Sequence, residues 1–480
     1  MIGHAANRRV AIIGAGLTGL SAAHRLCSLD PQIDVTLFEA ADRSGGLIET
    51  VRRDGFLIER GADSFITNKP AAIELCRELG LENQLIPTNN RYRGALVLRN
   101  GKPTPVPPGF SLLTPSRLGP IFRSPLFSLR GKLRIAAEQF VRRSKSDKEE
   151  SLSEFVRRRF GKEAFERLVQ PMVGGIYTAD PQRLSLAATM PRFIDMEREH
   201  GSLIKATRQQ AAADGNADNH ASGARYGLFT TFQDGMQQFF GELQKQVAAR
   251  TNIRFNTPVT SVATMQAGGW TVKTDDSIEE FDDVIFSTST YVAARLLAES
   301  KPTLAARLED IEYASTAVVV TTHRLQDIEF PCNAFGLVIP AIENRRILAV
   351  SFSSRKFPRR APDDHILLRT FVGGATQPEL LNRSDDELVD LVREELSAIL
   401  GVHHRESLSL VTRYNKAMPQ YHIGHQQRIQ TIEQQVAVTS GLQLAGSAYH
   451  GVGIPDCVRS GREAAEATVR NAGGRLRETT

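Results

Sequence analysis

The sequence predicts an α/β fold in which one parallel-sheet domain is assembled from separated segments, with an α+β domain and a helical insert between them. The first observation is that residues 10–38 have the pattern of a buried strand, a glycine-rich turn, a helix and a second strand. The second is that residues 444–465 repeat the order of strand, glycine-rich turns and helix. The third is a β pattern in residues 252–288, which supplies further strands from the middle of the chain.

Length and composition are those of a globular protein of about three domains. Of the 480 residues 41% are hydrophobic and 24% are charged, which excludes a disordered or collagen-like chain. The net charge of +5 is too small to indicate nucleic acid as a partner. No apolar run reaches the roughly 18 residues of a membrane span, and the opening MIGHAANRR is too short and polar for a signal or transit peptide. We therefore expect a cytoplasmic protein.

The four cysteines are spread along the chain without paired spacing. This pattern excludes a disulfide framework and a thiolate zinc site, and it fits a reducing compartment. The sequence predicts no metal site.

The first glycine-rich turn has the spacing of a dinucleotide-binding turn. Gly14, Gly16 and Gly19 would allow a tight turn, close approach of a pyrophosphate to the backbone, and packing of the helix on the strand. The phosphates would lie at the helix N-terminus, where free N–H groups favour an anion. Glu39 lies 20 residues past Gly19, where a carboxylate binds a ribose hydroxyl and disfavours a 2′-phosphate. The ligand is therefore FAD or NAD.

Two further elements favour FAD. Arg43, Gly45 and Gly46 directly follow Glu39 in a pattern that resembles the second pyrophosphate turn of the amine oxidase and protoporphyrinogen oxidase flavoprotein superfamily. Residues 444–465 resemble the element that brings backbone and a helix N-terminus to the flavin ring in that superfamily. The resemblance also implies that the residue matching Val259 packs beside the adenine. An NAD dehydrogenase needs no second nucleotide-contacting element so late in the chain.

The segments between these elements resemble the oxygen-dependent protoporphyrinogen and coproporphyrinogen oxidase family. The matching segments occur in family order at 60–65, 170–186, 335–340, 351–362 and 371–374, and the resemblance covers residues 9 to about 470. The chain departs from the family pattern at Thr178-Ala179, Asp234 and Tyr414, which could alter flavin packing and substrate fit.

The resemblance implies a domain organisation and a set of site residues. The FAD-binding Rossmann-like domain would comprise 1–85, 232–300 and 410–475, the α+β substrate domain 86–110, 205–231 and 301–409, and the helical domain 111–204. The substrate would contact Arg91, Gly175, Val338 and Phe371. Non-covalent FAD would contact Gly14, Gly16, Leu17, Thr18, Gly19, Glu39, Ala40, Arg43, Gly45, Gly46, Gly61, Ala62, Asp63, Ser64, Val259, Tyr414, Gly446, Val452, Gly453 and Ile454.

The expected chemistry belongs to the cofactor. The sequence contains neither of the hydrolase motifs H-E-x-x-H and G-x-S-x-G, and in flavin oxidation the protein mainly supplies position and electrostatics, so no catalytic side chain is expected. The resemblance implies transfer of a hydride from a methylene bridge of protoporphyrinogen IX to flavin N5. Three such steps, each followed by reoxidation with O2, would give protoporphyrin IX and three H2O2 in haem synthesis.

Arg91 is the expected anchor for the substrate's propionates, with Arg93 as the alternative, because a guanidinium holds a carboxylate through two hydrogen bonds. Coproporphyrinogen III is the alternative substrate, and the presence of Arg91 favours protoporphyrinogen. The 175–181 segment disfavours an amine oxidase or a carotenoid desaturase. A flavin-binding interaction protein without turnover is the alternative from another class.

The insert from 103 to about 190 alternates apolar residues, among them Phe122 and Phe127, with basic residues. This pattern suits helices that lie on an anionic lipid surface, such as the face of the cytoplasmic membrane, and the family's peripheral attachment supports that interpretation. The alternative is a helical domain that buries the same residues. A homodimer also stays open.

Two residues near the expected flavin have simpler interpretations. His450 is expected to be a solvated turn residue. Cys457 lies just inside a helix and is expected to be a packed thiol without a covalent flavin bond.

Overall fold

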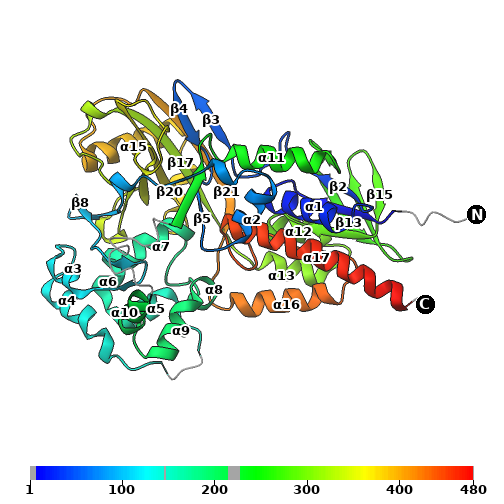
Figure 1. Cartoon of the computed structure of the whole chain (residues 1–480), viewed down its shortest axis with the longest axis horizontal. Coiled ribbons are helices and arrows are strands. Elements are labelled where there is room, and N and C mark those ends of the chain that lie inside the picture. The colour runs from blue at the N-terminus through cyan, green and yellow to red at the C-terminus, as the bar shows by residue number, and fades with distance from the viewer. Residues whose placement is uncertain (1–6, 145–147, 214–227, 479–480) are drawn as a thin grey trace, which may run out of the picture.

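The computed structural model describes residues 7–144, 148–213 and 228–478 (Figure 1). Figure 1 shows a sheet covered by α1, α11 and α17 on the right, a second sheet beside α15 at the upper left, and a group of helices at the lower left. The mixed architecture confirms the predicted α/β fold. The exact domain boundaries stay a prediction, and residues 214–227 of the segment 205–231 lie outside the described residues.

The first sheet is entirely parallel and joins three distant parts of the chain. The three central strands, at 9–13, 34–38 and 283–286, are rich in branched apolar residues and almost wholly buried, which is typical of a parallel sheet between helical layers. In spatial order the strands are β12 (Asn252–Arg254), β2 (Asp34–Phe38), β1 (Arg9–Ile13), β16 (Asp283–Phe286) and β22 (Leu442–Leu444).

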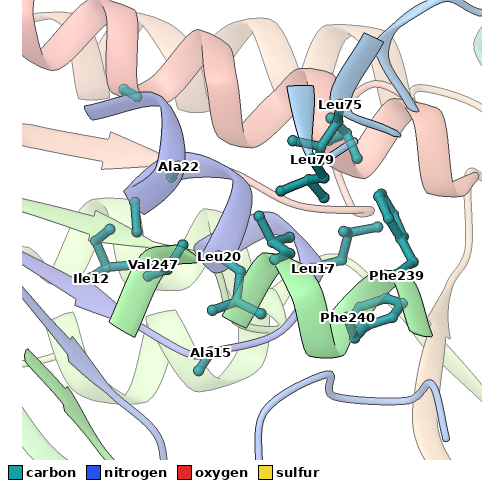
Figure 2. Close-up of a cluster of buried hydrophobic side chains, with 14 of the residues drawn as sticks. Ile12, Ala15, Leu17, Leu20, Ala22, Leu75, Leu79, Phe239, Phe240 and Val247 are labelled. Carbon is teal, nitrogen blue, oxygen red and sulfur yellow. The ribbon is translucent and has the colours of Figure 1, made fainter. Parts of the chain in front are cut away.

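One face of this sheet is covered by helices that share a single core (Figure 2). Figure 2 shows Leu17 and Leu20 of α1 in the same cluster as Phe239 and Phe240 of α11. Burying each such side chain contributes about 1.5–3 kcal/mol. The helices are α1 (Leu17–Leu29), α2 (Ala71–Glu78), α11 (Gln237–Ala248) and α17 (Ile454–Glu478).

The other face carries an antiparallel meander and three helices around the fully buried Trp270. The Trp270 indole N–H donates to the Ser440 carbonyl at 3.1 Å, so this large side chain is also satisfied as a donor. The elements are β13 (Val259–Thr264), β14 (Trp270–Thr274), β15 (Ile278–Phe281), α12 (Thr290–Leu297), α13 (Pro302–Glu309) and α16 (His425–Ala437).

The second large sheet has seven strands of mixed direction, and α15 (Asp385–Leu400) packs on one of its faces. α15 begins with a capping box between Ser384 and Glu387 and ends at Gly401 in the left-handed conformation. The strands in spatial order are β21 (Leu408–Pro419), β17 (Tyr313–Arg324), β20 (His365–Gly373), β19 (Ala349–Phe352), β18 (Gly336–Val338), β7 (Leu96–Arg99) and β8 (Lys102–Pro105).

Short sheets join these layers. β11 pairs with both β5 and β6, and β3 pairs with β4. Their bounds are β3 (Thr50–Arg53), β4 (Phe56–Glu59), β5 (Phe65–Ile66), β6 (Leu85–Pro87), β11 (Phe229–Phe232), β9 (Phe110–Ser111) and β10 (Thr114–Pro115).

The lower-left group of helices has its own core, and a fully buried Arg159 pairs with the buried Glu138 inside it. Its helices are α3 (Leu118–Arg123), α4 (Leu129–Ala136), α5 (Leu152–Phe160), α6 (Lys162–Ala164), α7 (Gln170–Tyr177), α8 (Leu186–Thr189), α9 (Pro191–His200) and α10 (Leu203–Ala213). A π-helical turn at Phe165–Val169 precedes α7.

Most of the alternating apolar residues of the insert are buried in this core, as the alternative of a helical domain predicted, and contact with lipid stays a prediction. Phe110, Leu113, Ile121, Leu126 and Phe127 are buried. Phe122, Leu129, Leu133 and Phe140 are exposed and form what we call the exposed apolar set. In the described part of the chain, no helix combines the length and hydropathy of a bilayer span.

Close packing of α17 on α1 requires Gly461. A Cβ at Gly461 would collide with the Thr18 carbonyl oxygen and lie 3.1 Å from the Ala22 nitrogen. We expect Gly461→Ala to lower the free energy of unfolding by about 1–3 kcal/mol, measured as a lower melting temperature by circular dichroism. Gly119→Ala is the control, because a Cβ there meets nothing within 4 Å. Equal melting temperatures for the two variants would contradict this account of the packing.

Candidate functional site

The three glycines of the opening turn have three different surroundings. Gly14 has φ +103°, and a Cβ there would lie 3.1 Å from the Ser287 hydroxyl oxygen. A Cβ at Gly19 would collide with the Gly14 carbonyl, whereas one at Gly16 would meet nothing within 4 Å. Of these glycines, Gly16 therefore faces open space at the N-terminus of α1, as a pyrophosphate-binding position requires.

Glu39 lies at the rim of the same turn. Its carboxylate accepts hydrogen bonds from the backbone N–H groups of Ala15 at 2.8 Å and Ala41 at 2.9 Å. These bonds hold both oxygens beside the turn, where a ribose would follow the pyrophosphate. Val259, the predicted adenine neighbour, is buried in the adjoining core.

The second glycine turn packs directly on the first. The Gly45 N–H donates to the Ala15 carbonyl at 3.0 Å, and a Cβ at Gly46 would lie 3.5 Å from the Gly16 Cα. Arg43 donates to the carbonyls of Ser44, Gly46 and Ile48 at 3.0–3.2 Å. Arg43 therefore shapes this turn, and its predicted contact with phosphate stays a prediction.

The closing element reaches the same sheet edge as the opening turn. The Ser287 N–H donates to the Ile13 carbonyl at 3.0 Å, and the Ala445 N–H donates to the Phe286 carbonyl at 2.8 Å. The carboxyl ends of β1, β16 and β22 therefore lie side by side, and ligands of such sheets bind outside those ends. Sequence analysis missed Ser287, although it directly follows a predicted strand.

The turn before α17 is fixed by a buried tyrosine that the sequence analysis also missed. The Tyr421 hydroxyl donates to the Ser447 carbonyl at 2.7 Å and accepts from the Gly451 N–H at 2.8 Å. Gly446 and Gly451 have φ of +137° and +140°, a region that favours glycine. These contacts place Val452, Gly453 and Ile454 at the N-terminus of α17.

Together these elements fit FAD. The opening at Gly16 is a cradle that a side chain would fill, and the N-termini of α1 and α17 follow the turns at this sheet edge. The residues that would hold the cofactor come from Gly14–Gly19, Glu39–Gly46 and Gly446–Ile454.

The predicted FAD-contacting segment Gly61–Ser64 is held by cations of the seven-stranded sheet. Asp63 accepts from Lys356 at 2.9 Å and lies 3.3 Å from Arg369, which also donates to the Gly61 carbonyl. Burial raises the pKa of Asp63, but Lys356 and Arg369 outweigh burial and hold the pKa below its usual range. Asp63 therefore anchors the segment through protein partners, and its direct contact with FAD stays a prediction.

Three of the four predicted substrate residues, Gly175, Val338 and Phe371, lie close together. Val338, Ala349 and Phe371 lie opposite one another on neighbouring strands, so their side chains share one face of the sheet. Gly175 of α7 faces this row, since a Cβ there would lie 4.0 Å from Val338 Cγ1. Tyr414 lies on the same face and donates to the Arg60 carbonyl, and burial raises its pKa to about 12. We call Val338, Ala349 and Phe371 the apolar row.

The fourth residue, Arg91, lies in a 3-10 turn at Asn90–Tyr92, just before β7, which pairs with β18. Arg91 is exposed, and its guanidinium carbon lies 5.4 Å from the centre of the Tyr92 ring. The alternative Arg93 has a buried Nε without a hydrogen-bond partner.

The interpretations of His450 and Cys457 agree with the structure. His450 is half exposed and lies 2.5 Å from Glu433. Cys457 packs against the core beside α1, and burial raises the pKa of its thiol to about 11. A thiol held protonated and packed in this way is a poor nucleophile.

The opening turn generates a matched pair of variants. Gly16→Ala should leave the melting temperature of the flavin-free protein unchanged and weaken FAD binding at least about tenfold, or about 1.4 kcal/mol, because the methyl group occupies ligand space. Gly19→Ala should lower that melting temperature by a backbone collision. Differential scanning fluorimetry and flavin absorbance titration measure the two effects, and tight FAD binding by Gly16→Ala would contradict the assignment.

Comparisons with known proteins agree with this geometry. Residues 17–469 match the family of flavin containing amine oxidoreductases. The chain is 33% identical to the coproporphyrinogen III oxidase of Bacillus subtilis over 465 residues, which cover 95% of this chain and 97% of that protein. It is 31% identical to protoporphyrinogen oxidase 2 of Arabidopsis thaliana over 492 residues, covering 96% and 94%.

A solved structure gives the same result. The crystal structure of an Exiguobacterium sp. 255-15 protein described as a protoporphyrinogen oxidase superposes with a TM-score of 0.85 and 30% sequence identity. The match covers 96% of this chain and 98% of that one. These findings confirm the resemblance to the porphyrinogen oxidases. The chain belongs to the family of flavin containing amine oxidoreductases and is an oxidoreductase with FAD as its cofactor.

Proposed function

We propose that this protein oxidises coproporphyrinogen III to coproporphyrin III with O2 in tetrapyrrole synthesis. The observation that carries the proposal is the apolar row opposite Gly175, with Arg91 and Arg355 at the end of the same sheet and, among the described residues, no carboxylate in an ion pair with either. A flat, apolar macrocycle fits the row, and its propionates fit the arginines. The names of the Bacillus, Arabidopsis and Exiguobacterium relatives support porphyrinogen as the substrate class.

Protoporphyrinogen IX, which the sequence favoured because of Arg91, is the second candidate. It has two propionates where coproporphyrinogen III has four, and two of the relatives reported above carry its name. Arg93 lies two residues after Arg91, and Arg355 donates to the hydroxyl of the adjacent Tyr92. These additional cations favour the substrate with more carboxylates.

The chain's own residues would position the substrate. When bound, FAD supplies the acceptor for the electrons of each oxidation step. Gly175 leaves room beside Val338, and the Phe371 ring offers an apolar contact for a pyrrole. Apolar side chains around the bridging carbon exclude water, while Arg91 fixes the substrate's orientation. Asp63, an acid near this face, is already paired with Lys356 and Arg369, so it is not free to bind the ammonium group of an amine.

Arg91→Ala tests the anchor. We expect the KM for either porphyrinogen to rise about tenfold with kcat nearly unchanged, because a charge-assisted contact to a remote carboxylate is lost. Porphyrin fluorescence in air measures both constants. Arg307→Ala, an exposed arginine of α13, is the control. An unchanged KM would remove Arg91 from the binding site, and a wild-type protein that oxidises neither porphyrinogen would overturn the proposed function.

We also propose that the exposed apolar set contacts an anionic lipid surface. Leu129 and Leu133 lie one turn apart on α4, and the exposed cations Arg123 and Arg130 lie close to them in the chain. Phe127, which the alternating pattern suggested as a lipid contact, is buried and is not part of this surface.

A double variant tests this surface. Leu133→Glu with Phe140→Glu should reduce co-sedimentation with phosphatidylglycerol vesicles at least about tenfold, since two large apolar contacts are lost. Val438→Glu is the matched control, because Val438 is 86% exposed and lies outside this group of helices. Equal sedimentation of the double variant and the wild type would show that the exposed apolar set does not bind lipid.

A further inference from the structure

Two arginines from distant parts of the chain share one tyrosine ring. The guanidinium carbons of Arg91 and Arg355 lie 5.4 and 4.8 Å from the centre of the Tyr92 ring. Arg355 also donates through Nη1 to the Tyr92 hydroxyl at 3.1 Å. Arg355 belongs to α14 (Ser353–Lys356), so β19 and its short extension bring it to the turn that carries Arg91.

The pair lacks an acidic partner. Within residues 7–144, 148–213 and 228–478, no carboxylate forms an ion pair with Arg91 or Arg355. The neighbouring cations differ, since Lys356 and Arg369 pair with Asp63. The Arg355 Nε is buried without a hydrogen-bond partner. Two guanidinium groups on one ring repel each other, and a carboxylate bound to each of them would relieve that repulsion.

The pair also lies beside the proposed substrate face. Lys356, next to Arg355, bonds Asp63 and Ser64 of the predicted FAD-contacting segment, each at 2.9 Å. The Asn89 N–H donates to the Lys356 carbonyl at 2.9 Å and ties the Arg91 turn to α14. β19 contributes Ala349 to the apolar row and ends just before α14. The arginines therefore lie beyond the end of β19, the strand that carries the middle residue of the row, on the side of the FAD-contacting segment.

We propose that Arg355 forms a second carboxylate site beside the Arg91 site and determines the preference for porphyrinogens with more propionates. This inference rests on the proposed function. Coproporphyrinogen III carries four propionates, so it can place a carboxylate against each arginine in more orientations than protoporphyrinogen IX can. Protoporphyrinogen IX carries vinyl groups in place of two of these propionates. A vinyl group against Arg355 would leave the guanidinium without a partner, which disfavours that substrate.

The test is Arg355→Met, which keeps much of the length and removes the charge. Steady-state oxidation in air is followed by porphyrin fluorescence for coproporphyrinogen III and protoporphyrinogen IX. The KM for coproporphyrinogen should rise about tenfold with kcat within about twofold, while the KM for protoporphyrinogen changes less than about twofold. Arg355→Lys should recover part of the loss. Arg324→Met, an exposed arginine at the far end of β17, should behave as the wild type.

A binding measurement separates failure of the site from failure of the proposed function. Fluorescence titration of the FAD-loaded protein with coproporphyrin III should show about tenfold weaker binding for Arg355→Met, at unchanged flavin content and melting temperature. If wild-type protein oxidises coproporphyrinogen but Arg355→Met keeps the same ratio of kcat/KM for the two substrates, the specificity role is wrong. If wild-type protein oxidises neither substrate, the proposed function fails, and equal coproporphyrin binding by wild type and Arg355→Met would overturn the carboxylate site as well.

Discussion

The carboxyl ends of β1, β16 and β22 lie at one edge of the parallel sheet, and the position of the candidate FAD site depends on this alignment. Backbone hydrogen bonds from Ser287 to Ile13 and from Ala445 to Phe286 align the three strands where each one stops. Because strands of a parallel sheet share a direction, turns that are far apart in the chain begin at the same edge. The glycine turns and the N-termini of α1 and α17 acquire their positions from that alignment.

A cluster of charged side chains joins the segment Gly61–Ser64 to the sheet that carries the apolar row. Asp63 accepts from Lys356 and Arg369, and the latter projects from the strand that carries Phe371. The segment Gly61–Ser64 is therefore held against the seven-stranded sheet by a buried ion cluster. Removing one member of such a cluster leaves a buried charge without its partner, which is strongly destabilising, so the cluster keeps the segment in place against the sheet.

Local patterns predicted the glycine turns well, because the geometry of a turn depends on a few consecutive residues. Gly14, Gly16 and Gly19 have the packing that their spacing predicted, whereas the contact of Glu39 with a ribose stays a prediction. Contacts such as Lys356 with Asp63 join residues 293 positions apart, and no local pattern records them. Phe127 was misplaced for a related reason, since the same alternation of apolar and basic residues suits a lipid surface and a helical core. The seven-stranded sheet face could be found only from strand register.

The distance in sequence between α1 and α17 has a consequence for biogenesis. Arg25 bonds Glu466 at 2.9 Å across 441 residues, and Gly461 packs against the carbonyl of Thr18. A ribosome must therefore synthesise almost the whole chain before the opening turn meets its closing helix, and contacts of such long range form slowly. The first strand has only β2 as a partner until β16 is made, and the turns at the sheet edge are complete only once α17 has packed on α1.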